Sequence, residues 1–240
     1  KKIFSNSLWM MIEKCISIFG LIFVTSFVAK HIGPENFGKI AFVNSIFVIV
    51  QTVTWFGNQE IAFKRISKNA KSGLIFLAST QKIRKIIFLL IAIPILLIFL
   101  VVSDRLTFIF GIATAISVFF LTQDYYVAYN NAMLRSYINA LSNSLGLITA
   151  LILRYLIVDF DFSIEFLSIP IIVVSLLPFF LRKYFFNKYD RVNSVNPSKY
   201  VKYYLVAGLG LLLSNLAVGF YTQINNFLLV ALRSVYELGI

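Results

Sequence analysis

Seven long runs of apolar residues alternate with short polar segments along the chain. A helix needs about 20 apolar residues to cross roughly 30 Å of hydrocarbon, and each run is close to that length. The dipeptide Gly33-Pro34 ends the first run, because proline cannot extend the helical hydrogen-bond ladder. The pattern therefore predicts seven membrane-spanning helices, over residues 7–30, 37–56, 86–102, 106–127, 137–158, 164–181 and 203–232.

Composition indicates the same class of protein. Of the 240 residues, 59% are hydrophobic and 13% are charged, whereas soluble domains average about 45–50% and about 25%. These values exclude an ordinary soluble domain, a disordered chain and a disulfide scaffold. The apolar runs are continuous, whereas the strands of an outer-membrane barrel alternate polar and apolar residues. We expect an all-α, polytopic membrane helical bundle.

The charges predict the orientation of this bundle. Lys and Arg number 22 against 10 Asp and Glu, which gives a net charge of +12. The cations gather in every second loop, whereas the loop after the fourth run carries only Asp124 and Arg135. The positive-inside rule then places the amino terminus in the cytoplasm of a bacterial inner-membrane protein, and we expect no nucleic-acid partner. The basic loops contain Lys64, Arg65, Lys68, Lys71, Lys82, Arg84 and Lys85, and then Arg182, Lys183, Lys188, Arg191, Lys199 and Lys202.

An apolar stripe lies among the lysines of the loop after the second run. Its spacing is typical of a helix lying in the membrane interface over anionic headgroups. A solvated cytoplasmic connector is the alternative. The stripe contains Ile61, Ile66, Leu74, Ile75, Phe76 and Leu77.

The pattern of the first run returns in the seventh. Residues 27–38 and 228–239 each end a long apolar helix in a short polar turn closed by a glycine, 201 positions apart. Transporters are often built from such repeats, with the substrate path between them. We therefore expect a first six-helix lobe of a two-lobed transporter at 1–182, a cytoplasmic linker at 183–202, and the start of a second, truncated lobe at 203–240.

Three stretches resemble a known family. They are residues 7–14, the turn at 31–38, which is similar to the pattern LGPxxFG, and residues 211–240. With them the chain resembles the lipid-linked oligosaccharide flippases of bacterial polysaccharide synthesis, the O-antigen, Wzx-like group of the multidrug/oligosaccharidyl-lipid/polysaccharide exporter superfamily. At 223–226 this chain carries Gln-Ile-Asn-Asn where the family often has Arg-Ile-Asp-Gln. The resemblance implies at least twelve spans in the complete protein, and an undecaprenyl-pyrophosphate-linked glycan carried from the cytoplasmic to the periplasmic leaflet.

Three charged residues lie well inside the predicted spans, away from the span ends. A charge at the centre of a spanning helix costs at least about 2.5 kcal/mol, so such residues usually face a cavity or a partner. Glu13 and Lys14 either face a substrate cavity, where Glu13 could couple transport to an ion gradient, or only orient the first helix. Arg154 either snorkels outward toward Asp159 or Asp161, or points inward and binds the pyrophosphate of the substrate, which its planar guanidinium suits.

Amide side chains form the second set of candidates. Asn139 and Asn143 share one face of the fifth predicted helix, and three amides of the seventh are further candidates. Such groups can exchange several hydrogen bonds with sugar hydroxyls, or they can hold packed helices together. The candidate substrate-binding set is Lys14, Arg154, Asn139, Asn143, Asn215, Gln223 and Asn226.

No catalytic motif is visible. The single histidine, His31, has no second histidine or cysteine close in sequence with which to share a metal, and no phosphate-binding glycine loop is present. We expect no cofactor and no enzymatic activity; membrane lipid and a glycan-synthesis complex are the other expected partners. A cation-coupled multidrug exporter of the same superfamily remains the alternative, followed by a membrane glycan polymerase or ligase and a non-transporting scaffold.

Overall fold

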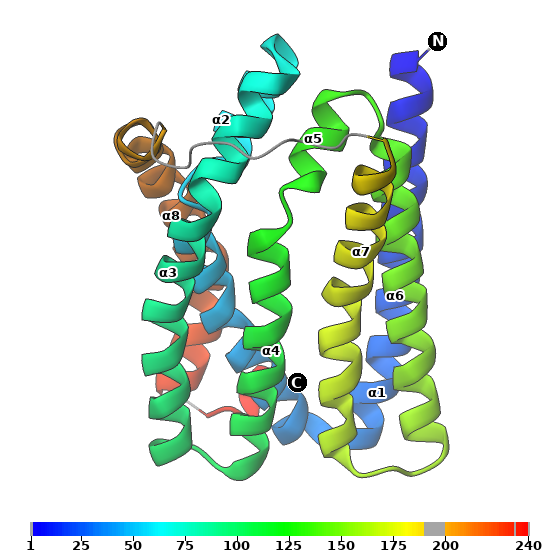
Figure 1. Cartoon of the computed structure of the whole chain (residues 1–240). Coiled ribbons are helices and arrows are strands. Elements are labelled where there is room, and N and C mark those ends of the chain that lie inside the picture. Colours follow the sequence, from blue (N-terminus) through cyan, green and yellow to red (C-terminus); the bar gives the residue numbers. More distant parts are fainter. Residues whose placement is uncertain (1, 190–199, 233, 240) are drawn as a thin grey trace.

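The computed structural model describes residues 2–189, 200–232 and 234–239 (Figure 1). Within these ranges the secondary structure is helical, without strands. Arg191 and Lys199 of the predicted basic loop, and residues 190–199 of the predicted linker, lie outside the described residues. The helices are α1 (Lys2–Trp55), α2 (Asn58–Lys68), α3 (Ala70–Val102), α4 (Arg105–Gln123), α5 (Tyr126–Ala132), α6 (Ser136–Asp159), α7 (Ser168–Tyr189) and α8 (Val201–Leu232), with short 3-10 helices η1 (Ile164–Leu167) and η2 (Glu237–Gly239).

Helix α1 contains both of the first two predicted spans. It bends at Gly33, whose φ of 78° and ψ of 164° break the helical geometry. Glycine adopts this left-handed φ without a Cβ penalty, and Pro34 then starts the next segment at a position where a missing N–H costs little. The bend divides α1 into a first leg, residues 2–32, and a second leg, residues 34–55.

Six helices of the described chain are long and apolar enough to cross a membrane, and α1 is the first of them. With its two legs, the six helices account for all seven predicted spans. The prediction of a polytopic all-α bundle is therefore confirmed.

The helices run between two ends of the bundle (Figure 1). The amino terminus, α2 and α5 lie at one end, which we name the N-terminal end. The bend of α1, the short turns after α3 and α6, and η2 lie at the opposite end, which we name the bend end. The two predicted basic loops therefore begin at the same end as the amino terminus, as the alternation of charges predicts.

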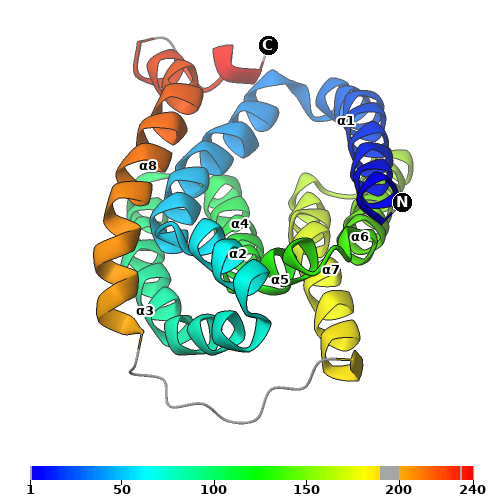
Figure 2. The ribbon, with the colours of Figure 1, turned by 90° about the horizontal axis from the view of Figure 1, so that it is seen from above.

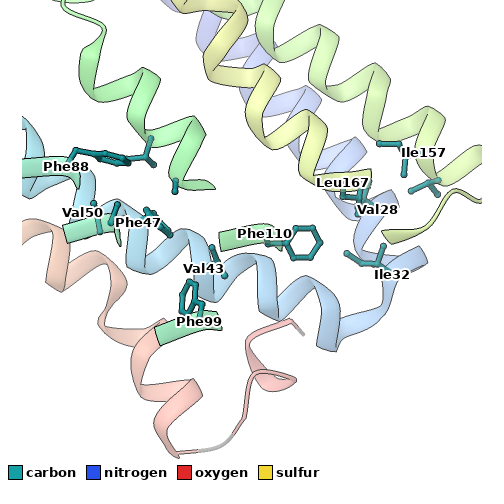
Figure 3. Packing of buried hydrophobic residues seen from close by; sticks show 14 residues of the cluster. Val28, Ile32, Val43, Phe47, Val50, Phe88, Phe99, Phe110, Ile157 and Leu167 are labelled. Atoms are coloured by element: carbon teal, nitrogen blue, oxygen red, sulfur yellow. The ribbon is translucent and has the colours of Figure 1, made fainter. Parts of the chain in front are cut away.

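One apolar core joins the legs of α1 to α3, α4 and α6. Val43, Phe47 and Val50 on the second leg are buried in one cluster with Phe110 of α4 and with Phe88 and Phe99 of α3 (Figure 3). In a membrane the lipid is as apolar as these side chains, so close packing holds the helices together more than exclusion of water does. The legs of α1 are thereby fixed against the rest of the bundle.

A second core lies at the N-terminal end. Ile61, Ile66, Phe76 and Leu77 are buried there and pack in one cluster with Tyr204 of α8. The interfacial-helix interpretation of this stripe is therefore wrong, because its central apolar side chains cover other helices and not lipid. The lysines on the other side of α2 and at the start of α3, Lys64, Lys68 and Lys71, are exposed.

Candidate functional site

A cavity lies inside the bundle between the two legs of α1 and helices α4, α6 and α7. Its volume is about 420 Å³. Apolar side chains such as Val28 and Ile171 form part of its wall, and no carboxylate of the described residues lines it. The polar lining residues are Thr25, Asn44, Gln51, Thr114, Ser117 and Arg154.

Among the described residues of this lining, Arg154 of α6 is the only cation. Its side chain is half-buried, and within the described part of the chain it has no hydrogen bond or ion pair. It lies inside the bundle, so the structure favours the inward alternative over the outward one. Asp161, one of the proposed outward partners, lies instead 3.5 Å from Nε2 of His31. The guanidinium thus keeps paired donors available for an anion in the cavity.

The hydroxyl and amide groups of the cavity come from regular helix faces. Asn44 and Gln51 are seven residues apart on the second leg, and Thr114 and Ser117 are three apart on α4. These spacings place each pair on one face of its helix. Sequence reasoning did not select these residues, although the spacing is the signal that would have found them.

Glu13 and Asn143 belong to a separate network at the N-terminal end. Asn143 donates from Nδ2 to Oε1 of Glu13 over 2.7 Å, and its Oδ1 accepts from Nη1 of Arg182 over 2.6 Å. Arg182 also donates to Oδ2 of Asp124, from Nε over 2.8 Å and from Nη2 over 2.5 Å. The network therefore links α1, α6 and α7 to the C-terminal cap of α4.

The sequence assigned Arg182 and Asp124 to loops, yet both side chains are only 2% exposed. A buried pair of this kind is held by charge-assisted hydrogen bonds. The signal for Asp124 was its place at the end of an otherwise apolar run, where a carboxylate needs a partner. Arg182 carried no such signal, because it begins a run of basic residues.

Arg84 of α3 is a second buried arginine that sequence reasoning placed in a loop. It is 1% exposed, and its Nε and Nη2 find no hydrogen-bond partner among the described residues. The carboxylate of Asp124 and the phenols of Tyr125 and Tyr204 lie in its surroundings. The loop after the second predicted span is thus in part a buried extension of α3.

Lys14 is not brought to the cavity. It is exposed on the first leg of α1, next to the network residue Glu13, and it has no partner in the described structure. The structure therefore does not join the two predicted substrate-binding cations, Lys14 and Arg154, in one site.

The other candidate amides occupy three different places. Asn139 is buried near the start of α6, where it accepts from Asn130 and donates to Asn131 and to the carbonyl of Val127. These bonds hold α5 against α6. Asn215 donates to Glu60 over 3.2 Å at an exposed position.

Gln223 and Asn226 lie together on α8. Asn226 donates to Oε1 of Gln223 over 2.9 Å and to Oγ of Ser45 on the second leg of α1 over 2.8 Å. Gln223 stands where the resembling family often has an arginine, and through Asn226 it takes part in a contact between α8 and α1. Neither lines the cavity of Arg154.

Three comparisons with known proteins bear on the family. A family model described as polysaccharide biosynthesis protein matches residues 1–240. Neither the search of curated proteins nor the search of solved structures found a match. The match spans the whole sequence and so includes every helix described above. The chain therefore belongs to the polysaccharide biosynthesis protein family.

Proposed function

We propose that the protein flips an undecaprenyl-pyrophosphate-linked oligosaccharide repeat unit across the bacterial inner membrane, for O-antigen or capsular polysaccharide synthesis. The family and the six spanning helices support a polysaccharide-related membrane transporter. The alternation of basic loops supports an amino terminus in the cytoplasm. The N-terminal end of the bundle then faces the cytoplasm and the bend end faces the periplasm.

The observation that carries the proposal is the unpartnered guanidinium of Arg154 in a polar cavity. Moving a pyrophosphate through hydrocarbon unaided is prohibitive, because the buried charges lose their hydration. A fixed cation at membrane depth lowers that cost, and arginine gives a phosphate paired, charge-assisted bonds. A cavity that is lined by this cation and by no described carboxylate suits an anion better than a cationic drug.

The other groups have supporting roles in this proposal. The hydroxyls and amides around Arg154 can bond to sugar hydroxyls, and the lipid tail stays in the bilayer. Asn143, Asn215, Gln223 and Asn226 could meet the glycan only after helices move, since each now bonds within the protein. Coupling through Glu13 stays a prediction. The proposed process moves a substrate without making or breaking its bonds, so we infer neither an enzyme nor a cofactor.

Complementation tests the proposal. The full reading frame is expressed in a strain without its own flippase, and surface glycan and accumulated lipid-linked precursor are measured. Arg154→Gln is expected to reduce surface glycan at least about tenfold, because the charge for the pyrophosphate is lost. The control is Arg105→Gln, because Arg105 is 81% exposed and lies at the bend end.

Two results would contradict the proposal. One is a wild-type level of glycan from Arg154→Gln at equal protein abundance. The other is no glycan from the unmutated protein with any of several repeat-unit structures, together with lower accumulation of a cationic dye. The second result would favour the multidrug exporter.

A further inference from the structure

Two glycine-containing segments, which we name the glycine turns, meet at the bend end of the bundle: residues 33–38, which run from the bend into the start of the second leg, and residues 234–239. The turn at 234–239, which contains η2, packs against the second leg of α1 next to the bend (Figure 2). A Cβ atom on Gly38 would overlap the carbonyl oxygen of Val235. A Cβ atom on Gly239 would overlap the carbonyl oxygen of Pro34. Both contacts are backbone to backbone, so no side chain can move aside to relieve the overlap.

The 201-residue repeat relates these two contacts to each other. Gly38 and Gly239 are 201 positions apart, and so are Pro34 and Val235. The same separation relates the two apolar helices that precede the turns. Gly38 meets the carbonyl of Val235, and its equivalent Gly239 meets the carbonyl of Pro34, which is the equivalent of Val235. Such reciprocity is the mark of a two-fold, self-complementary contact.

The packing of α8 extends this relation along the bundle. Near the bend end, Asn226 of α8 bonds to Ser45 of the second leg. Toward the N-terminal end, Gly208 lies against the carbonyl of Phe56. Helix α8 thus runs antiparallel along the second leg, whereas its equivalent by the 201-residue relation is the first leg. Figure 2 places α8 and the first leg on opposite sides of the ring of helices.

We propose that the turns at 33–38 and 234–239 form a gate between two repeat-related units, and that the structure holds this gate closed at the bend end. The contact needs a glycine on each side, since a Cβ on either would wedge the backbones apart. Because the contact is reciprocal, the two glycines contribute equally. The assignment of this end to the periplasm rests on the proposed function, but the contact itself does not.

Thiol labelling of the full-length protein in membranes tests the gate. The native Cys15 is replaced by serine, and Ala41→Cys reports from the cavity wall beside the second leg. Gly38→Ala and Gly239→Ala are each expected to raise labelling by an impermeant maleimide added at the bend end by about tenfold, through a shift toward the open population. The control is Gly210→Ala on α8, because a Cβ there meets nothing within 4 Å.

Labelling separates this inference from the proposed function, because it needs no substrate. If both glycine variants label at the control rate while folded, the gate is wrong. A large effect at one glycine only would overturn the reciprocity.

Cysteine cross-linking is a second test, and it uses variants that retain both glycines. Its outcome therefore does not depend on whether the glycine variants fold. Glu35→Cys and Tyr236→Cys lie beside the two contacts, and both side chains are exposed. A short bis-maleimide with a cleavable linker is expected to stop transport in the double variant, and cleavage is expected to restore it. Full transport by the cross-linked protein would contradict the gate. Each single-cysteine variant treated with the same reagent serves as control.

Discussion

Arg154 and Arg182 both lie on apolar helices of the same bundle, but their surroundings differ. Arg182 uses three nitrogens on two partners, Asp124 and Asn143, and is almost fully buried. Arg154 lines a cavity and has no partner in the described structure. The guanidinium of Arg182 is fully engaged in bonds within the protein, whereas that of Arg154 can still bind an anion.

The difference shows how structural and functional charges are told apart in a membrane. A paired buried charge returns part of its desolvation cost through its partner, so removing one member strands the other. An unpaired charge destabilises the fold because its desolvation is not compensated, and a bound ligand of opposite charge can supply the compensation. The comparison therefore predicts opposite effects of mutation on stability and on transport at the two sites.

The largest effect is expected at the paired site. Arg182→Met should lower the free energy of unfolding by about 3–5 kcal/mol, because Asp124 would stay buried without a partner. Thermal unfolding of the purified protein in detergent measures this loss. Combining Arg182→Met with Asp124→Leu should recover much of it. A single variant as stable as the unmutated protein would show that the pair does not hold the helices.

At the unpaired site we expect the opposite behaviour. Arg154→Leu should leave the melting temperature unchanged or raise it, because it removes an unpartnered charge from the bundle. The same variant should lose at least about tenfold in surface glycan, since the cavity no longer attracts a phosphate. Measuring both quantities on one preparation sharpens the comparison, and a marked loss of stability would mean that Arg154 is structural.

A smaller effect is expected at the link between the helices of the network. Asn143→Ala should cost about 1–3 kcal/mol, because Nη1 of Arg182 is left without its acceptor. Asn215→Ala is the matched control, since its bond to Glu60 is exposed, and we expect it to stay within about 0.5 kcal/mol. Equal losses at the two positions would argue against a special role of the network.

The smallest effect concerns pH at the bend end. Burial acts to raise the pKa of Asp104, but hydrogen bonds from Thr107 and Lys39 outweigh it and hold that pKa below its ordinary value. Ionised Asp104 therefore stabilises the fold above the ordinary aspartate pKa, about 4, and this stabilisation is lost as pH falls through the lowered pKa of Asp104.

Asp104→Asn should remove this dependence at a cost of under about 1 kcal/mol, since the side chain of Asp104 is 47% exposed and water screens the ion pair. Melting temperatures between pH 3 and pH 7 in steps of about half a unit would detect it. The exposed Asp159 supplies the control substitution, Asp159→Asn. A variant with the same pH profile as the unmutated protein would exclude the assigned role.

The spans were predictable because each depends on a local run of apolar residues. Even the bend of α1 was marked in the sequence by Gly33-Pro34. The buried pair was not, because Asp124 and Arg182 are 58 residues apart and only the packing of α4 against α7 brings them together. The interfacial-helix prediction for the apolar stripe of α2 and α3 failed because residues distant in sequence bury the stripe, among them Tyr204 on α8.

The candidate site was predictable only in part. Arg154 stood out as a charge inside an apolar run, and its inward position was one of two alternatives. The sequence could not show which amides line a cavity and which hold helices together. Asn139 on α6 and Asn226 on α8 have the same kind of spacing on an apolar helix as a cavity-lining amide would have. Their hydrogen bonds within the protein distinguish them.

Direct binding tests most sharply whether Arg154 is the cation kept for the substrate. The full-length protein is purified, and the dissociation constant for undecaprenyl pyrophosphate is measured for the unmutated protein, Arg154→Gln and Arg105→Gln. The account predicts at least about tenfold weaker binding by Arg154→Gln at an unchanged melting temperature, with Arg105→Gln like the unmutated protein. Equal affinity of all three would contradict it.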